Sequence, residues 1–168
     1  MTKLERDLEK KLAGEKRKSQ ADVLTELALT GAELFHTPTK EAFISFATGN
    51  HRENWPVRSA PTRDRLIQLL WTRTKKAPNR EALHSAIGTL HAIATCEGAE
   101  KQVHLRSAWH DGNLYYDLAD PRWRCVEVTK KGWRVIDKSP VKFRRFSHMA
   151  AQVEPQPGGN LDDLWPFT

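Results

Sequence analysis

The chain has 168 residues, and its 27 lysines and arginines against 21 acidic residues give a net charge of +6. This length fits one domain with appendages, and the basic charge favours nucleic acid or an acidic surface as partner. No apolar run is long enough to span a membrane, and the start lacks a signal-peptide pattern. The chain has only two cysteines, Cys96 and Cys125, which are too few for a cysteine-only zinc site. They lie far apart and form no CxxC, which indicates free thiols in a cytoplasmic setting.

Helical patterns dominate the beginning of the chain. Residues 1–18 are predicted to form a helical extension, because a narrow apolar stripe recurs every four residues at Leu4, Leu8 and Leu12. Ser19, followed three residues later by Asp22, resembles a capping box. A second helix is therefore predicted to begin there and to stop at Gly31.

A small antiparallel β unit and two helices are predicted next. The strands are expected at 34–36, 42–47 and 51–58, with Pro56 marking the last of them as an edge strand. Pro61 fits the first turn of a helix, and Asn79 fits the N-cap of another. Helical periodicity predicts that the buried faces consist of Leu66, Ile67, Leu70 and Trp71 in the first helix and Leu83, Ile87, Leu90 and Ala94 in the second.

Short strands and tight turns follow between 101 and 145. Val103, Leu105 and Trp109 are expected to share one face of a strand over 101–109, and Asp111-Gly112 is a strong signal for a type I′ hairpin. Further strands of this meander are predicted at 114–118, 123–128, 133–136 and 141–145.

The sequence thus predicts an α+β fold. Its parts are N-terminal helices, a small antiparallel β unit, a two-helix insertion and a C-terminal antiparallel β-meander. The domain is expected over 19–150, and a Pro/Gly linker and tail over 151–168.

Cations greatly outnumber acids in the meander and again between 52 and 80. Such cations neutralise phosphates, and interleaved aromatic rings stack on unpaired bases. The alternative is that the rings belong to the core and the cations to a solvated face. The predicted nucleic-acid contacts are Trp55, Arg58, Arg63, Arg65, Arg124, Trp133, Arg134, Lys142, Arg144 and Arg145, with Trp55 and Trp133 as stacking residues. No catalytic residue, metal ligand or cofactor site is predicted.

Enzymatic motifs are mostly missing. The chain has no GxxxxGK[ST], no GxGxxG that opens a helix and no GxSxG. Asp117 or Asp120 with Glu127 and Lys130 offers a metal-dependent nuclease as an alternative. However, two residues separate Glu127 from Lys130, whereas the usual nuclease spacing has one, so the lysine would lie on the other face of the strand.

One segment of the chain, followed by a basic helix, resembles a G-x-x-E-x-W-P-x-R-S segment of bacterial and phage primase–helicase-like proteins. It reads His51-Arg52-Glu53-Asn54-Trp55-Pro56-Val57-Arg58-Ser59. The runs 116–118, 126–129, 132–135 and 140–145 and the exit with Gly158-Gly159 are similar to the same proteins, so the resemblance covers about 31–167. It implies a region that precedes a P-loop ATPase in mobile-element DNA replication. It implies no catalytic residue here, and the chain is expected to end where the ATPase would start.

Together these observations predict a DNA-binding accessory domain of a mobile-element replication protein. It would prefer single strands or forks, act largely without sequence specificity, and have an ATPase or helicase domain as a partner. The alternative from another class is a protein-interaction or oligomerisation module that uses the N-terminal leucine stripe and the Trp165–Phe167 tail.

Overall fold

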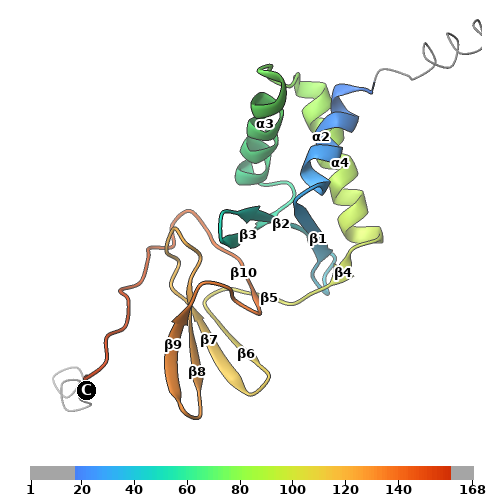
Figure 1. Cartoon of the computed structure of the whole chain (residues 1–168). Coiled ribbons are helices and arrows are strands. Elements are labelled where there is room, and N and C mark those ends of the chain that lie inside the picture. Colours follow the sequence, from blue (N-terminus) through green and yellow to red (C-terminus); the bar gives the residue numbers. More distant parts are fainter. Residues whose placement is uncertain (1–17, 160–168) are drawn as a thin grey trace, which may run out of the picture. The chain divides into compact units, whose positions relative to one another are not determined.

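The computed structural model describes residues 18–159 (Figure 1). The predicted helix over 1–18 and the Trp165–Phe167 tail lie outside these residues. The described chain, including the 19–150 range that we assigned to one domain, divides into two compact units. The first unit comprises 18–46 and 55–101, and the second comprises 47–54 and 102–159. The α+β class is confirmed, and a C-terminal antiparallel meander is present.

The first unit contains three helices, namely α2 (Gln20–Leu29), α3 (Ala60–Thr74) and α4 (Arg80–Cys96). The strands of its sheet are β1 (Ala32–His36), β2 (Ala42–Thr48), β3 (His51–Pro56) and β4 (Ala99–Glu100), in the order β3-β2-β1-β4. The edge position predicted for the strand with Pro56 is confirmed. The tip of the β2–β3 hairpin, residues 47–54, belongs to the second unit.

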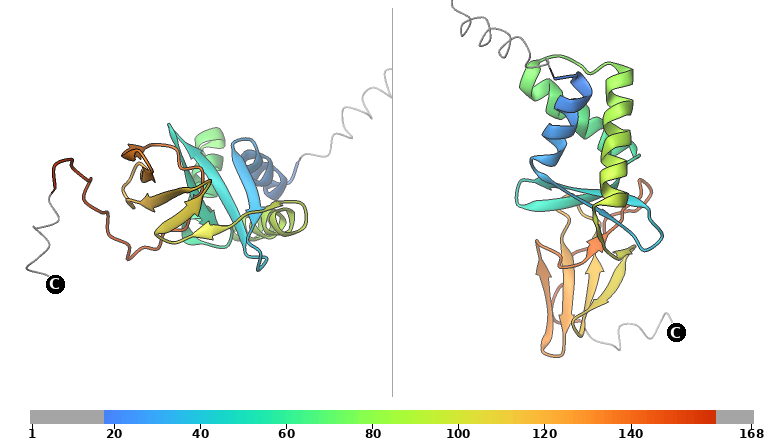
Figure 2. Two further views of the ribbon diagram at one scale, coloured as in Figure 1. Left: turned by 90° about the horizontal axis from the view of Figure 1, so that it is seen from below. Right: turned by 90° about the vertical axis from the view of Figure 1, so that its right-hand side faces the viewer.

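The helices of the first unit lie on one face of this sheet, as both figures show (Figures 1 and 2). Alternate residues of β2, Ala42, Ile44 and Phe46, point toward the helices and pack with Leu24, Leu66 and Leu90 in one buried cluster. The predicted caps are confirmed, since Ser19 and Asp22 form the capping box of α2, and Asn79 accepts from the Ala82 amide at 2.7 Å.

The buried face of α3 differs from the prediction at one tryptophan. Thr62, Leu66 and Leu70 are buried, but Trp71 is 50% exposed. These three residues are spaced by four and lie on one side of the helix. Trp71 is the residue after Leu70, so its side chain points away from that side. The prediction that Trp71 belongs to the core was therefore wrong.

The second unit is built mainly of β-structure. Its strands are β5 (Val103–His104), β6 (Ser107–His110), β7 (Asn113–Asp117), β8 (Cys125–Thr129), β9 (Gly132–Ile136) and β10 (Lys142–Phe143). The order β6-β7-β8-β9 is an antiparallel meander, while β5 and β10 pair in parallel as a separate sheet. Ala108, Tyr115, Cys125 and Phe143 belong to its buried cluster.

Turn chemistry explains the first hairpin of the meander. Asp111 and Gly112 have φ of +48° and +75°, and the flanking His110 and Asn113 pair with each other. Two positive φ angles in a two-residue loop are what a type I′ turn requires, so this prediction is confirmed.

Two strand predictions were wrong. The segment 101–109 is broken at a bend around Leu105, and its two parts join different sheets. The bend restarts the alternation of side chains, so Ala108 is buried while Trp109 is 72% exposed. The segment 141–145 does not close the meander, because only Lys142 and Phe143 form a strand, and they pair with β5.

Within the described residues, no helix combines the length and the apolar character that crossing a membrane would require.

Candidate nucleic-acid interface

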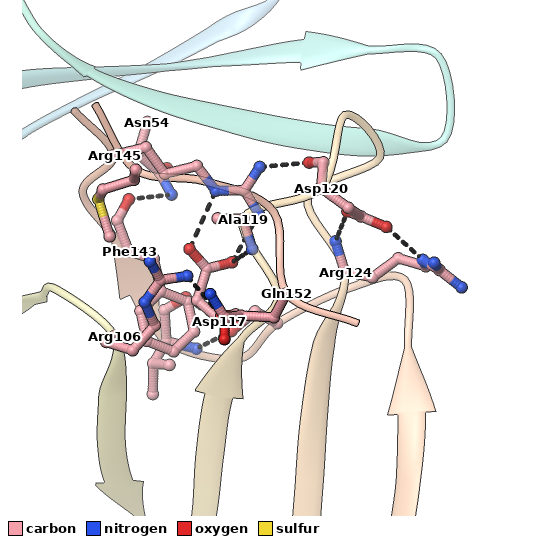
Figure 3. A network of polar contacts seen from close by, with 12 residues as sticks. Asn54, Arg106, Asp117, Ala119, Asp120, Arg124, Phe143, Arg145 and Gln152 are labelled. Carbon is pink, nitrogen blue, oxygen red and sulfur yellow. Dashed lines mark hydrogen bonds and ion pairs between the residues drawn. The ribbon is translucent and has the colours of Figure 1, made fainter. Parts of the chain in front are cut away.

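A buried ion pair organises the end of β7 in the second unit (Figure 3). Asp117 is only 1% exposed, and Arg145 binds both of its carboxylate oxygens, with Nε–Oδ2 at 3.0 Å and Nη2–Oδ1 at 2.5 Å. Arg145 Nη1 also donates to the Asp120 carbonyl, and Arg106 Nη1 donates to the Asp117 carbonyl at 3.2 Å. Arg145, which we predicted to contact nucleic acid, thus uses its side chain for contacts within the second unit.

Trp123 lies beneath the same guanidinium. The Arg145 Cζ stands 4.0 Å from the centre of the Trp123 ring, close enough for a cation–π contact. The loop between β7 and β8 turns sharply, with Ala119 and Trp123 at φ of +53° and +56°. Asp117 Oδ1 accepts from the Ala119 amide at 3.2 Å, which ties this loop to the ion pair.

Arg124 is likewise held within the unit. Its side chain is 14% exposed, with Nε 2.6 Å from Asp120 Oδ2 and Nη2 2.9 Å from Glu154 Oε2. Burial alone would raise the pKa of Asp120, but hydrogen bonds from the Arg124 side chain and backbone outweigh it and lower that pKa. The two carboxylates, Glu154 foremost, raise the pKa of Arg124.

Glu127 is bound from two sides on the face of the meander that carries the buried cluster. Arg134 Nε lies 2.5 Å from Glu127 Oε2, and the Tyr115 hydroxyl donates to Oε1 at 2.9 Å. The hydrogen bond from Arg134, followed by that from Tyr115, lowers the pKa of Glu127. The Arg134 side chain itself is 72% exposed and can present its remaining donors to a ligand.

The carboxylates considered for a nuclease are therefore each bound to an arginine: Asp117 to Arg145, Asp120 to Arg124 and Glu127 to Arg134. Residues 18–159 contain no group of three or more histidine, cysteine, aspartate or glutamate side chains placed to hold a metal ion.

The other predicted residues of the second unit, Trp133, Lys142 and Arg144, are each at least partly exposed. Trp133 on β9 is 43% exposed. Arg144 lies over the Phe146 ring, with its Cζ 4.7 Å from the ring centre. Lys142 lines a cavity of about 350 Å³ together with Lys138 and Trp123.

In the first unit, Arg58 and Arg63 line an open groove of about 1020 Å³ between the start of α3 and the first turns of α4. Arg80 and His84 contribute from α4, while Leu83 and Ile87 add apolar surface to the lining. Among residues 18–159, no acidic side chain forms an ion pair with any of the three arginines, although Glu81 also lines the groove.

Arg80 and His84 were missed as site residues. The signal for them was present, because Asn79 marks the start of α4 and residues 80, 84 and 87 then fall on one face of the helix. What the sequence alone lacked was the placement of that face opposite Arg58 and Arg63.

The remaining two predicted contacts of the first unit are tied to neighbours. Trp55 is partly buried and packs against the helix–sheet core. Arg65 donates from Nη1 to Gln68 at 2.8 Å, and its Cζ lies 5.9 Å from the centre of the Phe46 ring.

Comparison of the chain with protein-family models, curated proteins and solved structures yields no match.

Proposed function

We propose that this chain binds DNA through phosphate contacts that carry no sequence information. The observation that supports this proposal most is the groove of the first unit, where Arg58, Arg63 and Arg80 converge without an acidic partner among residues 18–159. Like charges gathered in one groove repel each other, and an anionic ligand relieves that repulsion. Guanidinium groups suit phosphate because they donate several hydrogen bonds in a planar fork.

The size of the groove also fits a polyanion rather than a single small anion. It follows α4 from Arg80 to Gly88, which at 1.5 Å per residue is a length of about 12 Å. Duplex DNA carries one phosphate charge per roughly 1.7 Å of its axis, so several phosphates come within reach of the three side chains.

The test is a fluorescence-anisotropy titration of labelled single-stranded and duplex DNA at several salt concentrations. Alanine at Arg63 or Arg80 should weaken binding and reduce the slope of log K against log salt by roughly 0.7 to 0.9 for each phosphate that is no longer neutralised. Arg73→Ala is the matched control, because Arg73 is exposed on the same helix as Arg63 but does not line the groove. Arg73→Ala should change neither the affinity nor the slope.

Absence of binding even at low salt would reject this function. A reduction of the slope by Arg73→Ala as large as that by Arg63→Ala would also count against the groove, since binding would then reflect overall charge.

In the wider proposal this DNA binding serves a mobile-element replication protein, in which the chain acts as an accessory domain beside an ATPase or helicase. The resemblance of 51–59 and of the meander to primase–helicase-like proteins supports that setting. Stimulation of such an ATPase by the chain on forked DNA, abolished in Arg63→Ala, would test it.

A further inference from the structure

One face of the meander carries a row of apolar side chains that crosses all four strands. Trp109 on β6 pairs in register with Leu114 on β7, Leu114 with Val128 on β8, and Val128 with Trp133 on β9. Paired residues of neighbouring strands lie on the same face of a sheet, so the four side chains form one continuous row. The two tryptophans occupy its ends, roughly 14 Å apart at about 4.8 Å per strand.

This row is open to solvent. Trp109 is 72% exposed, Trp133 43% and Val128 37%, whereas Leu114 is half-buried. The next row, Ala108, Tyr115 and Glu127, faces the opposite side and is buried. The meander therefore uses one face for the core of the unit and leaves large aromatic surface on the other, which is typical of a binding surface.

The charge beside the row indicates what binds there. Lys130 and Lys131 form the turn that joins Val128 and Thr129 to Gly132 and Trp133, and both are exposed. Their side chains form no ion pair with any residue of 18–159. Figure 1 shows this turn at the same end of the meander as the β6–β7 turn. Aromatic rings beside such cations suit unpaired bases linked by phosphates.

We propose that this row is a stacking platform for the bases of single-stranded DNA, with Trp109 and Trp133 as the stacking residues. The inference rests on the proposed function and adds what the second unit recognises. Lys130 and Lys131 contact the phosphates beside the stacked bases. Duplex DNA keeps its bases in the helical stack, so the platform discriminates against it.

The experiment compares three labelled ligands of equal length by anisotropy: a single strand, a single strand with abasic sites, and a duplex. The abasic strand keeps the phosphates but lacks the bases that would stack. The variants are Trp109→Ala, Trp109→Phe and Trp133→Ala. Trp71→Ala is the matched control, because Trp71 is 50% exposed on α3 in the first unit. Thermal unfolding shows that each variant remains folded.

Replacement of a stacking aromatic side chain by alanine removes the stacking contact, which typically weakens binding of a single strand by roughly 5- to 150-fold. Trp109→Ala and Trp133→Ala should each show such a loss, and Trp109→Phe a smaller one. Binding to the abasic strand, and the salt slope of all variants, should stay unchanged because phosphate contacts remain. Trp71→Ala should behave as the unaltered protein.

Equal binding of the intact and abasic strands, or no effect of either alanine variant, would overturn the platform while leaving DNA binding in place. Failure of the unaltered protein to bind any of the three ligands would overturn both proposals. Self-association that Trp109→Ala abolishes, with DNA binding intact, would overturn the platform and assign the row to an interface between copies of the chain instead.

Discussion

Arg145 and Asp117 form a two-point ion pair in which both partners are nearly excluded from solvent, at 8% and 1% side-chain exposure. Twenty-eight residues separate them in sequence. The pair links the end of β7 to the segment after β10, and the Arg145 contact with the Asp120 carbonyl extends it into the loop before β8. The pair therefore connects the end of β7, the loop before β8 and the segment after β10.

Removal of the arginine should be strongly destabilising. In Arg145→Met the Asp117 carboxylate would be left buried without a counter-charge, which typically costs about 3–5 kcal/mol of unfolding free energy. Urea denaturation measures the loss. Adding Asp117→Asn to Arg145→Met removes the buried charge and should recover part of the stability. A double variant no more stable than the single one would show that impaired packing, not an uncompensated charge, is responsible.

Stability should depend on pH through Asp120. Its pKa lies below the ordinary value of 3.8, so the unfolded chain takes up this proton first as the pH falls. The stabilisation is present above that ordinary value and is lost as the pH drops through the lower pKa of the folded protein. Urea midpoints measured between pH 7 and pH 2 should therefore fall at the acid end. Asp120→Asn should flatten this fall, whereas Asp64→Asn on the exposed surface of α3 should not.

Local chemistry explains which parts of the fold could be predicted from the sequence. The Ser19 and Asn79 caps and the Asp111-Gly112 turn depend on residues a few positions apart, and all three appear as expected. Pairings between distant segments left no such local signal. The parallel contact of β10 with β5 is of this kind, and it removed 141–145 from the meander.

The candidate site shows the same limit. Composition identified the cations, but it could not tell which of them are neutralised inside the fold. Arg124 and Arg145 are held by Asp120 and Asp117, whereas Arg63 has no acidic partner among residues 18–159. Trp109 was expected to share a face with Val103 and Leu105 because the alternation was followed through the bend at Leu105, where the pairing partner changes.

The two cysteines should differ sharply in reactivity. Burial raises the pKa of the Cys125 thiol to about 11, whereas Cys96 is exposed. At pH 8 only about one Cys125 in a thousand is then the reactive thiolate, and its sulfur is shielded by the core. Ellman's reagent should titrate one thiol rapidly in the folded protein and the second only after unfolding. Cys96→Ser should abolish the rapid phase; a rapid phase that persists would contradict the burial of Cys125.

Replacement by alanine should have opposite effects on stability at Gly98, which follows α4, and at Gly88, which lies within α4. A Cβ on Gly98 would lie 2.3 Å from the Ala94 carbonyl oxygen and 3.1 Å from Phe35 Cα, and these are backbone atoms that cannot rotate away. Gly98→Ala should therefore destabilise the first unit by about 1–3 kcal/mol, the usual cost of overpacking. Gly88 lies inside the helix, where a methyl group would have no neighbouring atom within 4 Å.

Gly88→Ala is thus the matched control for Gly98→Ala, and it should stabilise the protein by about 0.5–1 kcal/mol because alanine favours the helix. Urea denaturation of both variants beside the unaltered protein gives the two signs. A neutral Gly98→Ala would mean that α4 and β1 can separate at this point. β4 follows Gly98 directly and pairs with β1 at Phe35, and the next amide along, that of Lys101, donates to the His36 carbonyl. Separation of α4 from β1 should therefore also weaken the protection of the Lys101 amide against hydrogen exchange.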